Sequence, residues 1–412
     1  MSYAEQKELE SAYMMTTYGR KPVEFVKGEG MRLIDSDGKQ YLDFLSGIGA
    51  VSVGHANQAV TNALSAQAEK LIHVGNYFYV EGRGELTRDL SSLLNNGATS
   101  EDSWKCFFAN SGAEANEGAI KLARKYGKLH AEGAGTILTA KRSFHGRTLA
   151  TTAATAQEAK QESFAPMPSG FAHFDPDSLS DFQRVFSECA QAAEQTGCPE
   201  LAPVAVMLEC IQGEGGVWPV SEEILQGIRS HTNEQGLLLI IDEVQTGFFR
   251  TGLPFAFMFA GIKPDVVTLA KGIANGFPCA ALAATGKAAD VLVPGEHGST
   301  FGGSPLAIAA ARATLAELAK CDTAAHVVES GEYFKAQLSG LPHVTEVRGK
   351  GLMIGASLDK EIAGEVVDAA LARGFVMNNV GTSIIRFLPP LIVSKTDIDA
   401  LVIVLKEILE EL

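Results

Sequence analysis

Short apolar runs alternate with helical patterns between residues 100 and 300. The clearest runs are residues 237–241 and 266–270, which are aliphatic and bounded by Gly, Pro or charge. Runs of this length predict strands that are buried on both faces of a sheet. Further strands are predicted at 106–109, at 135–140 and directly before Glu209. Strands that alternate with helices are typical of a mostly parallel, doubly wound sheet, so the predicted fold class is α/β.

The two ends of the chain show other patterns. Residues 1–20 predict a polar helix followed by an arm. Residues 21–53 alternate apolar and polar side chains around Asp37-Gly38, which predicts a hairpin with its turn at that dipeptide. A helix predicted to begin near Pro305 leads into a second unit, which holds two further strand patterns and a final helix over 396–412.

Composition narrows the class of protein. The chain has 412 residues, of which 46% are hydrophobic and 20% charged, as is ordinary for a soluble globular protein. Its net charge of −15 argues against nucleic acid or an anionic membrane as the main partner. The acidic N-terminus lacks the apolar core of a signal peptide, and no apolar run approaches the ~20 residues of a membrane span. We therefore expect a cytoplasmic protein.

The cysteines lie singly along the chain. They are Cys106, Cys189, Cys198, Cys210, Cys279 and Cys321. None of them forms a CxxC motif, and no histidine spacing completes a zinc site, so we expect no metal. Scattered thiols of this kind favour a reducing compartment and structural roles.

Two of the apolar runs lead into candidate chemistry. Asp242 directly follows residues 237–241, and Lys271 directly follows residues 266–270. A single Lys or Asp after a strand is usually a surface or turn residue. However, the carboxyl ends of parallel strands are where open α/β sheets bind ligands. We interpret Lys271 as the lysine that bonds covalently to pyridoxal phosphate (PLP) and Asp242 as the partner of its ring nitrogen.

Other segments add candidates that are ambiguous one by one. Ser111 and Gly112 begin a predicted helix, whose free N–H groups and dipole suit a phosphate, although a serine there is more often a plain N-cap. Phe144 either packs in the core or stacks on an aromatic cofactor. Arg147 is either a solvated surface residue or binds a carboxylate through two hydrogen bonds. Glu209 ends a buried strand and Arg386 lies between apolar runs, so each needs a partner of opposite charge. Glu214, in a glycine-rich loop, reads most simply as an acid that faces water.

Seven motifs, in order along the chain, together resemble the class III (subgroup II) aminotransferases of PLP fold type I. They are NSGAEANEGAIKLARK, SFHGRT, ECIQGEGG, IIDEVQTGFFRTG, LAKGIANGFP, HGSTFGGSP and RFLPPL. The resemblance covers the chain from about Tyr18 to the C-terminus. It implies a large PLP-binding domain at 61–305. A smaller α+β domain would be built from an N-terminal arm and segment at 1–60 and a C-terminal segment at 306–412.

The resemblance also implies roles for individual residues. Lys271 would bind the cofactor and move a proton, Asp242 would pair with the ring nitrogen, and Gln245 would hydrogen-bond the ring's phenolic oxygen. The other cofactor-binding residues implied are Ser111, Gly112 and Ala113 at the phosphate, Phe144 and Val244 on the ring faces, His145, and Thr300. Thr300 would reach the phosphate of the neighbouring subunit, which implies a homodimer with shared active sites. The substrate-binding residues implied are Tyr18, Arg147, Arg386 and Glu209.

The activity implied is transfer of the terminal amine of N2-acetylornithine to 2-oxoglutarate, which gives N-acetylglutamate 5-semialdehyde and glutamate in arginine biosynthesis. Ile48 stands where family members that use ornithine have a tyrosine, which disfavours ornithine. Succinylornithine, N-succinyl-diaminopimelate and 4-aminobutyrate stay open as donors, as does an aminomutase on the same fold. We further expect Glu209 to pair with Arg386 while the terminal-amine donor is bound and to swing aside for glutamate, because an unpaired buried arginine costs about 3–5 kcal/mol.

Overall fold

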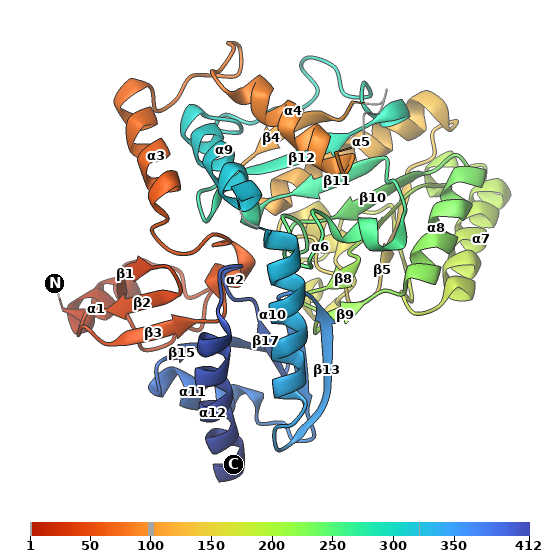
Figure 1. The fold of residues 1–412 in the computed structure, drawn as a ribbon. Coiled ribbons are helices and arrows are strands. Elements are labelled where there is room, and N and C mark those ends of the chain that lie inside the picture. Colours follow the sequence, from red (N-terminus) through yellow and green to blue (C-terminus); the bar gives the residue numbers. More distant parts are fainter. Residues whose placement is uncertain (1, 98–102, 321) are drawn as a thin grey trace.

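A central sheet of seven strands organises the larger part of the molecule (Figure 1). The computed structural model describes residues 2–97, 103–320 and 322–412. The strands are β4 (Lys105–Ala109), β5 (Thr136–Ala140), β6 (Phe171–Phe174), β7 (Pro203–Leu208), β10 (Leu238–Asp242), β11 (Val266–Leu269) and β12 (Ala280–Ala284). Their order is β4-β12-β11-β10-β7-β5-β6. Only β12 runs opposite to the other six strands, so the predicted mostly parallel α/β sheet is confirmed.

The middle strands form the centre of the core, as their sequences require. Every residue of β5, β7, β10, β11 and β12 is buried, because helices and loops cover both faces. The surrounding helices are α3 (Gln58–Lys70), α4 (Arg83–Leu94), α5 (Gly112–His130), α6 (Leu149–Ala154), α7 (Leu179–Thr196), α8 (Glu222–Glu234) and α9 (Pro305–Lys320). Helix α5 contacts β11 and β12, and α8 contacts β10.

Two four-stranded sheets lie beside the large one. The first joins β1 (Phe25–Glu29), β2 (Arg32–Asp35) and β3 (Gln40–Asp43) to β15 (Phe375–Val376), which pairs in parallel with β3. The second joins β13 (Val344–Lys350), β14 (Met353–Leu358), β17 (Ile384–Phe387) and β16 (Asn378–Val380). Segments from both ends of the chain therefore share one sheet, as the red and blue ribbons of Figure 1 show. The domain limits at 60/61 and 305/306 stay a prediction.

The remaining elements include the helices that pack against the smaller sheets and several short turns. They are α1 (Tyr3–Tyr13), α2 (Ser46–Gly49), α10 (Thr323–Leu338), α11 (Ala363–Ala372), α12 (Lys395–Glu411), the pair β8 (Ile211–Gln212) and β9 (Trp218–Pro219), and six 3₁₀ turns: η1 (Glu158–Lys160), η2 (Glu162–Phe164), η3 (Pro199–Leu201), η4 (Ala256–Ala260), η5 (Lys271–Ala274) and η6 (Gly286–Ala288). The Asp37-Gly38 turn falls between β2 and β3 as predicted, and Gly38 takes the positive φ that such a turn favours.

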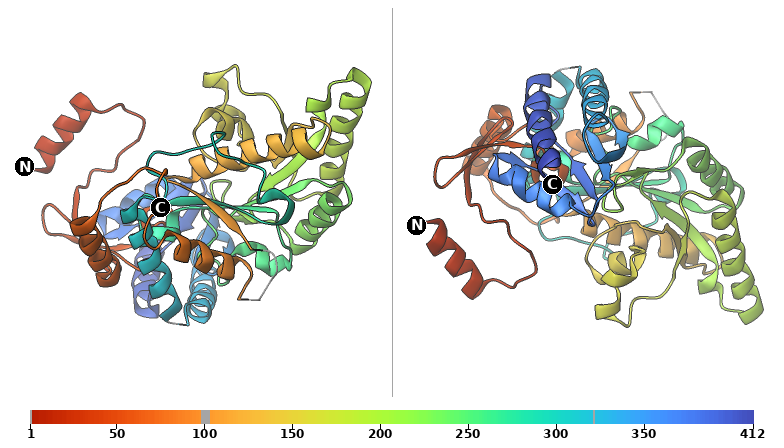
Figure 2. Two further views of the ribbon diagram at one scale, coloured as in Figure 1. Left: turned by 90° about the horizontal axis from the view of Figure 1, so that it is seen from above. Right: turned by 90° about the horizontal axis from the view of Figure 1, so that it is seen from below.

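The N-terminal helix stands apart from the body of the molecule (Figure 2). Helix α1 buries none of its residues and is capped by Ser2, so the predicted polar helix and following arm are confirmed. Across the described ranges, no helix has the length and apolar character that a bilayer crossing requires. Of the cysteines, Cys321 lies outside the described residues, and the other five are free thiols.

A buried arginine joins the loop after β10 to the second small sheet. Arg250 donates hydrogen bonds to the carbonyl oxygens of Leu352, at 3.1 Å, and Pro389, at 2.5 Å. Leu352 precedes β14 and Pro389 follows β17. One guanidinium therefore joins the start of β14 and the end of β17 to the loop after β10. This contact sets the position of Arg386, on β17, relative to the ends of β10 and β11.

Candidate active site

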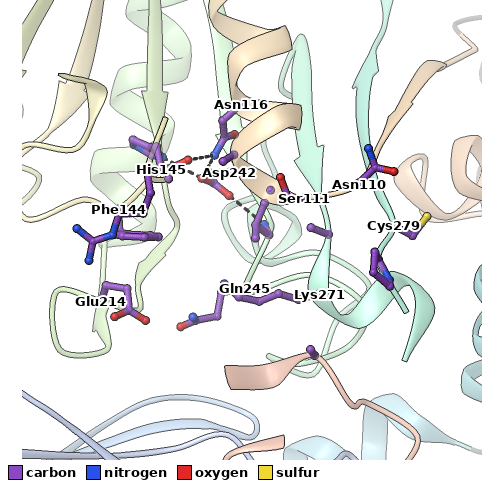
Figure 3. Close-up of a pocket in the computed structure, with 18 of the residues that line it drawn as sticks. Asn110, Ser111, Asn116, Phe144, His145, Glu214, Asp242, Gln245, Lys271 and Cys279 are labelled. Atoms are coloured by element: carbon purple, nitrogen blue, oxygen red, sulfur yellow. Dashed lines mark hydrogen bonds and ion pairs between the residues drawn. The ribbon is translucent and has the colours of Figure 1, made fainter. Parts of the chain in front are cut away.

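A cavity of about 400 Å³ opens at the carboxyl ends of β10 and β11. Figure 3 shows its walls, which come from the loops after four strands of the sheet and from the start of α5. Of the residues that the sequence suggested, those that line it are Ser111, Gly112, Ala113, Phe144, His145, Arg147, Glu209, Asp242, Val244, Gln245 and Lys271. The structure therefore brings most of the candidates to one place, although they span 160 residues of sequence.

Lys271 and Asp242 share this cavity because their strands are parallel neighbours. Asp242 is the last residue of β10 and pairs with Thr268 of β11, three residues before Lys271. Lys271 has a φ of 45°, in the left-handed region, where the chain turns sharply into η5. Burial lowers the pKa of the Lys271 amine, opposed by the negative charges of Asp242 and Glu214. A lowered pKa increases the fraction of neutral amine, which is the nucleophilic and proton-accepting form.

The Asp242 carboxylate is buried and held by three contacts. Its Oδ2 lies 2.8 Å from Nδ2 of Asn116 and 2.9 Å from Nδ1 of His145, and its Oδ1 accepts from the Val244 N–H at 3.0 Å. Dashed lines in Figure 3 mark the first two. Such contacts fix the direction in which the carboxylate points. Our reading of the sequence missed Asn116. The available signal was a polar side chain within the apolar pattern that α5 buries.

The N-terminus of α5 faces the same cavity. Ser111 caps the helix, with its Oγ accepting from the Glu114 N–H at 3.3 Å, and Gly112 and Ala113 follow as its first residues. The first N–H groups of any helix lack intrahelical acceptors and carry partial positive charge. A side chain at Gly112 would place its Cβ 2.8 Å from Val244 Cγ1, so it would have to displace Val244. The N-cap and anion-binding interpretations of Ser111 are therefore compatible.

Arg386 is paired differently from our expectation. The Arg386 side chain is only 1% exposed and forms an ion pair with Glu214, and its Nε donates to Asn378 Oδ1 at 3.2 Å. The predicted pairing of Arg386 with Glu209 is wrong, as is the interpretation of Glu214 as an acid that faces water. The Glu209 carboxylate instead accepts from the backbone N–H groups of Phe144, at 2.9 Å, and Gly213, at 3.3 Å.

The physical reason is the path of the loop between β8 and β9. The loop carries Glu214 towards β17, whereas Glu209, at the end of β7, is turned back onto nearby backbone donors. Burial raises the pKa of Glu209 to about 7. Burial would also raise the pKa of Glu214, but the charge and hydrogen bond of Arg386 lower it below the ordinary value. Glu214 is therefore the ionised partner of Arg386.

Tyr18 and Thr300 do not reach the cavity within this chain. Tyr18, on the arm after α1, is 77% exposed. Thr300 is exposed and lines a separate cavity of about 960 Å³ with Asn76 and Tyr77 among its neighbours. The roles expected of Tyr18 and Thr300 stay predictions.

Glu243, next to Asp242, should make stability depend on pH. Its side chain is fully buried and accepts hydrogen bonds from Thr246 Oγ1, at 2.5 Å, and from the Phe257 N–H, at 2.9 Å. Burial raises its pKa from 4.5 to about 7. The folded chain thus binds this proton more tightly than the unfolded chain, so the stabilisation is complete below pH 4.5 and is lost as the pH rises through 7.

We expect Glu243→Gln, which cannot ionise, to remove this contribution, on the order of 3 kcal/mol. Denaturant titrations at pH 5 and pH 8 should show a smaller loss of unfolding free energy in the variant than in the wild type. Glu8→Gln, at an exposed position on α1, is the matched control and should keep the wild-type pH dependence. An unchanged pH dependence in Glu243→Gln would contradict the assignment.

The fold and this site define a class of enzyme. The chain belongs to the class III aminotransferase family. The model of this family, described as "Aminotransferase class-III", matches residues 13–409. It is 44% identical over 408 residues to an acetylornithine aminotransferase from Caldanaerobacter subterraneus subsp. tengcongensis, and the match covers 98% of each chain. Among solved structures it is similar to acetylornithine aminotransferase from Elizabethkingia anophelis, with a TM-score of 0.84 and 29% identity over 100% of both chains.

A second similar structure bears on the cofactor of the family. It is ornithine aminotransferase from Toxoplasma gondii, described with partial occupancy of PLP at its active site. Its TM-score is 0.90 at 27% identity, covering 100% of this chain and 94% of that one. The family membership that the motifs suggested is therefore confirmed.

Proposed function

We propose that this chain is a PLP-dependent enzyme that transfers the terminal amine of N2-acetylornithine to 2-oxoglutarate, a step of arginine biosynthesis. One observation carries the proposal: an amine, Lys271, and a buried carboxylate, Asp242, enter one cavity that Glu214 also lines (Figure 3). Glu214 is in turn the ion-pair partner of Arg386. Relatives called acetylornithine aminotransferase, 41–44% identical over nearly the whole chain, support the choice of donor.

The residues of the cavity fit PLP. The N-terminus of α5 offers N–H groups for a phosphate, and Asp242 offers a charged acceptor for a protonated ring nitrogen. The buried amide of Gln245 has no partner for its Oε1 among the described residues, so this amide is available to a polar ligand. Phe144 and Val244 supply the apolar walls that an aromatic ring requires.

The reaction can be derived from what these residues do. Bound PLP supplies an aldehyde that joins the amine of the substrate and a ring that accepts electrons from the carbon next to that amine. Lys271 would hold the cofactor and would accept and return a proton at its Nζ, because burial lowers the pKa of this amine. Asp242, held in place by its contacts with His145 and Asn116, would hold the ring nitrogen of the bound cofactor through its carboxylate.

Arg386 and Glu214 let one site accept two kinds of donor. Glutamate has a carboxylate on its reacting carbon, which Arg386 can bind. Acetylornithine has no carboxylate there, and an arginine buried as deeply as Arg386 is costly when unpaired. Glu214 neutralises Arg386 while acetylornithine is bound and must release it when glutamate binds. The side-chain exposure of Glu214, 29% against 1% for Arg386, leaves Glu214 room to move.

Glu214→Gln should therefore affect the two half-reactions unequally. We expect it to slow the acetylornithine half-reaction at least about tenfold more than the glutamate half-reaction, because Arg386 is left without a counter-charge only in the former. Single-turnover absorbance changes of the cofactor measure each half-reaction separately. Glu223→Gln, on the exposed start of α8, is the control. Equal slowing of both half-reactions would contradict the role of Glu214.

The proposed substrate is tested by a panel of donors. We expect acetylornithine to give the highest kcat/KM when it is compared with succinylornithine, ornithine, N-succinyl-diaminopimelate and 4-aminobutyrate, with 2-oxoglutarate as acceptor. Turnover should require 2-oxoglutarate, which an aminomutase would not need. A wide margin in favour of ornithine or 4-aminobutyrate would overturn the choice of donor.

We also propose that a second copy of the chain completes the site. Thr300 lies on a surface where the side chains of Tyr77 and Tyr79 are almost fully exposed and Phe301 is largely exposed. Exposed aromatic clusters of this kind mark interaction surfaces. Light scattering should give twice the mass of one chain, and a monomeric, fully active protein would contradict the shared site.

A further inference from the structure

The loop that carries Glu214 is held by a second buried arginine, Arg348. This residue lies on β13, which β9 contacts (Figure 1), and its side chain is only 6% exposed. Its Nε and Nη2 both donate hydrogen bonds to the carbonyl oxygen of Gly216, at 3.0 and 2.7 Å. Its Cζ also lies 3.5 Å from the centroid of the Trp218 ring. Arginine suits such a contact because its fork of N–H donors is rigid and its plane stacks on aromatic rings.

Arg348 and Arg386 lie in register across one small sheet. In the pairing of β13, β14 and β17, Gly355 is opposite Arg348 on one side and opposite Arg386 on the other. Residues that pair directly in this way point to the same face of a sheet. The two arginines are therefore two strand spacings apart, roughly 10 Å, and both reach the loop between β8 and β9 that lies over this face.

Gly355 leaves room for the backbone of this loop. A Cβ at Gly355 would lie 3.0 Å from the Cβ of Val217 and 3.1 Å from the carbonyl oxygen of Gly216. A Cβ at Gly216 would in turn lie 2.8 Å from Cδ1 of Ile384, on β17. The backbone is thus closely packed against the sheet, whereas the Glu214 side chain is 29% exposed and has room to turn.

We propose that Arg348 is a positioning residue for the exchange of Glu214 and a substrate carboxylate at Arg386. The proposal rests on the proposed function and deepens it, because it assigns the fixed end of the same charge exchange. Arg348 holds the backbone, so Glu214 can leave Arg386 by turning its side chain alone and can return to the same place. Re-forming the ion pair then requires the ordering of one side chain and not of a whole loop.

The loss of Arg348 should affect the two substrates differently. Glu214 would be held less firmly at Arg386, so this buried arginine would more often stand unpaired while acetylornithine is bound. Glutamate brings its own carboxylate to Arg386, so its half-reaction does not depend on where Glu214 is held. Removal of the Arg348 fork should therefore act like a weaker form of Glu214→Gln.

Single-turnover absorbance changes of the cofactor test this difference. Arg348→Met keeps the apolar stem of the side chain and removes the fork. We expect it to slow the acetylornithine half-reaction about fivefold relative to the glutamate half-reaction, the size expected for one net hydrogen bond. Arg184→Met, at a half-exposed position on α7, also removes an arginine with ion pairs of its own and should leave both rates unchanged.

A double variant separates positioning from general damage. If Arg348 acts through Glu214, Arg348→Met should leave the ratio of the two half-reactions unchanged in the Glu214→Gln background. A merely structural role would instead slow both half-reactions equally in either background. Arg348→Lys keeps the charge without the planar fork and should give an intermediate ratio, and it replaces Arg348→Met if that variant does not fold.

Binding of glutarate gives a readout without turnover. Glutarate has the two carboxylates of 2-oxoglutarate and no group that reacts, and it would compete with Glu214 for Arg386. Because Arg348→Met weakens the hold of Glu214, calorimetric titration of this variant as the purified holoenzyme should show tighter glutarate binding than the wild type. A site that is merely damaged would bind glutarate more weakly.

The possible failures are distinguishable. If wild-type protein does not turn over acetylornithine, the proposed donor is rejected, and tighter glutarate binding by Arg348→Met would still support the positioning role. If wild-type protein does turn it over, an unchanged ratio of half-reactions in Arg348→Met overturns the positioning role. Weaker glutarate binding by Arg348→Met, or a full further loss in the Glu214→Gln background, would also overturn it.

Discussion

Replacing Lys271 with alanine should reduce transamination at least about 10⁴-fold, because in the proposed reaction one side chain both bonds to the cofactor and moves the proton. The purified wild-type protein should be yellow, with a visible absorbance band that borohydride abolishes and that glutamate shifts. Lys271→Ala should lack this band. Absorbance spectra and initial rates of the two purified proteins are the measurements.

A matched lysine variant shows whether the effect belongs to this amine. Lys128→Ala, at the exposed end of α5, should keep both the band and the activity. Circular dichroism of Lys271→Ala should match the wild type, because a partly buried side chain without a structural ion pair is removed. A yellow, active Lys271→Ala protein would reject the assignment of the covalent lysine.

Replacing Asp242 with asparagine should have the second largest effect. The variant keeps the shape of the side chain and removes the charge that favours a protonated ring nitrogen, so both half-reactions should slow about 10²- to 10⁴-fold, the range for breaking a buried ion pair. Single-turnover rates with acetylornithine and with glutamate measure the loss. Because the ring serves both half-reactions, both should fall together, unlike in Glu214→Gln.

Asn116→Ala is the comparison that separates charge from orientation. It removes one of the three contacts of the Asp242 carboxylate and leaves its charge in place. We expect a loss of about tenfold, the size of one hydrogen bond to a charged group. A loss in Asn116→Ala as large as that in Asp242→Asn would mean that orientation, and not charge, is what Asp242 contributes.

The central strands and the chemistry at their ends could be predicted because both depend on local sequence. The apolar runs at 237–241 and 266–270 fall on β10 and β11, with limits that differ by one residue. Parallel neighbouring strands end at the same edge of a sheet, so Asp242 and Lys271 had to lie close together once both runs were strands. The antiparallel direction of β12 and its place between β4 and β11 were not predicted, since they depend on the path of the loop before it.

The sequence by itself determined the α/β class, the strand ends that carry Lys271 and Asp242, the start of α5 at Ser111 and the need of Arg386 for an acidic partner. Only the tertiary structure decided that this partner is Glu214 and not Glu209, and that Asn116 supports Asp242. The physical reason is that a buried charge needs a partner of opposite charge. Composition and spacing reveal this need, because they show which charged residues lie within apolar runs. Which partner a buried charge receives depends on how distant segments meet in the fold. Glu214 and Arg386 are 172 residues apart in the sequence, and local patterns carry no information about such a contact.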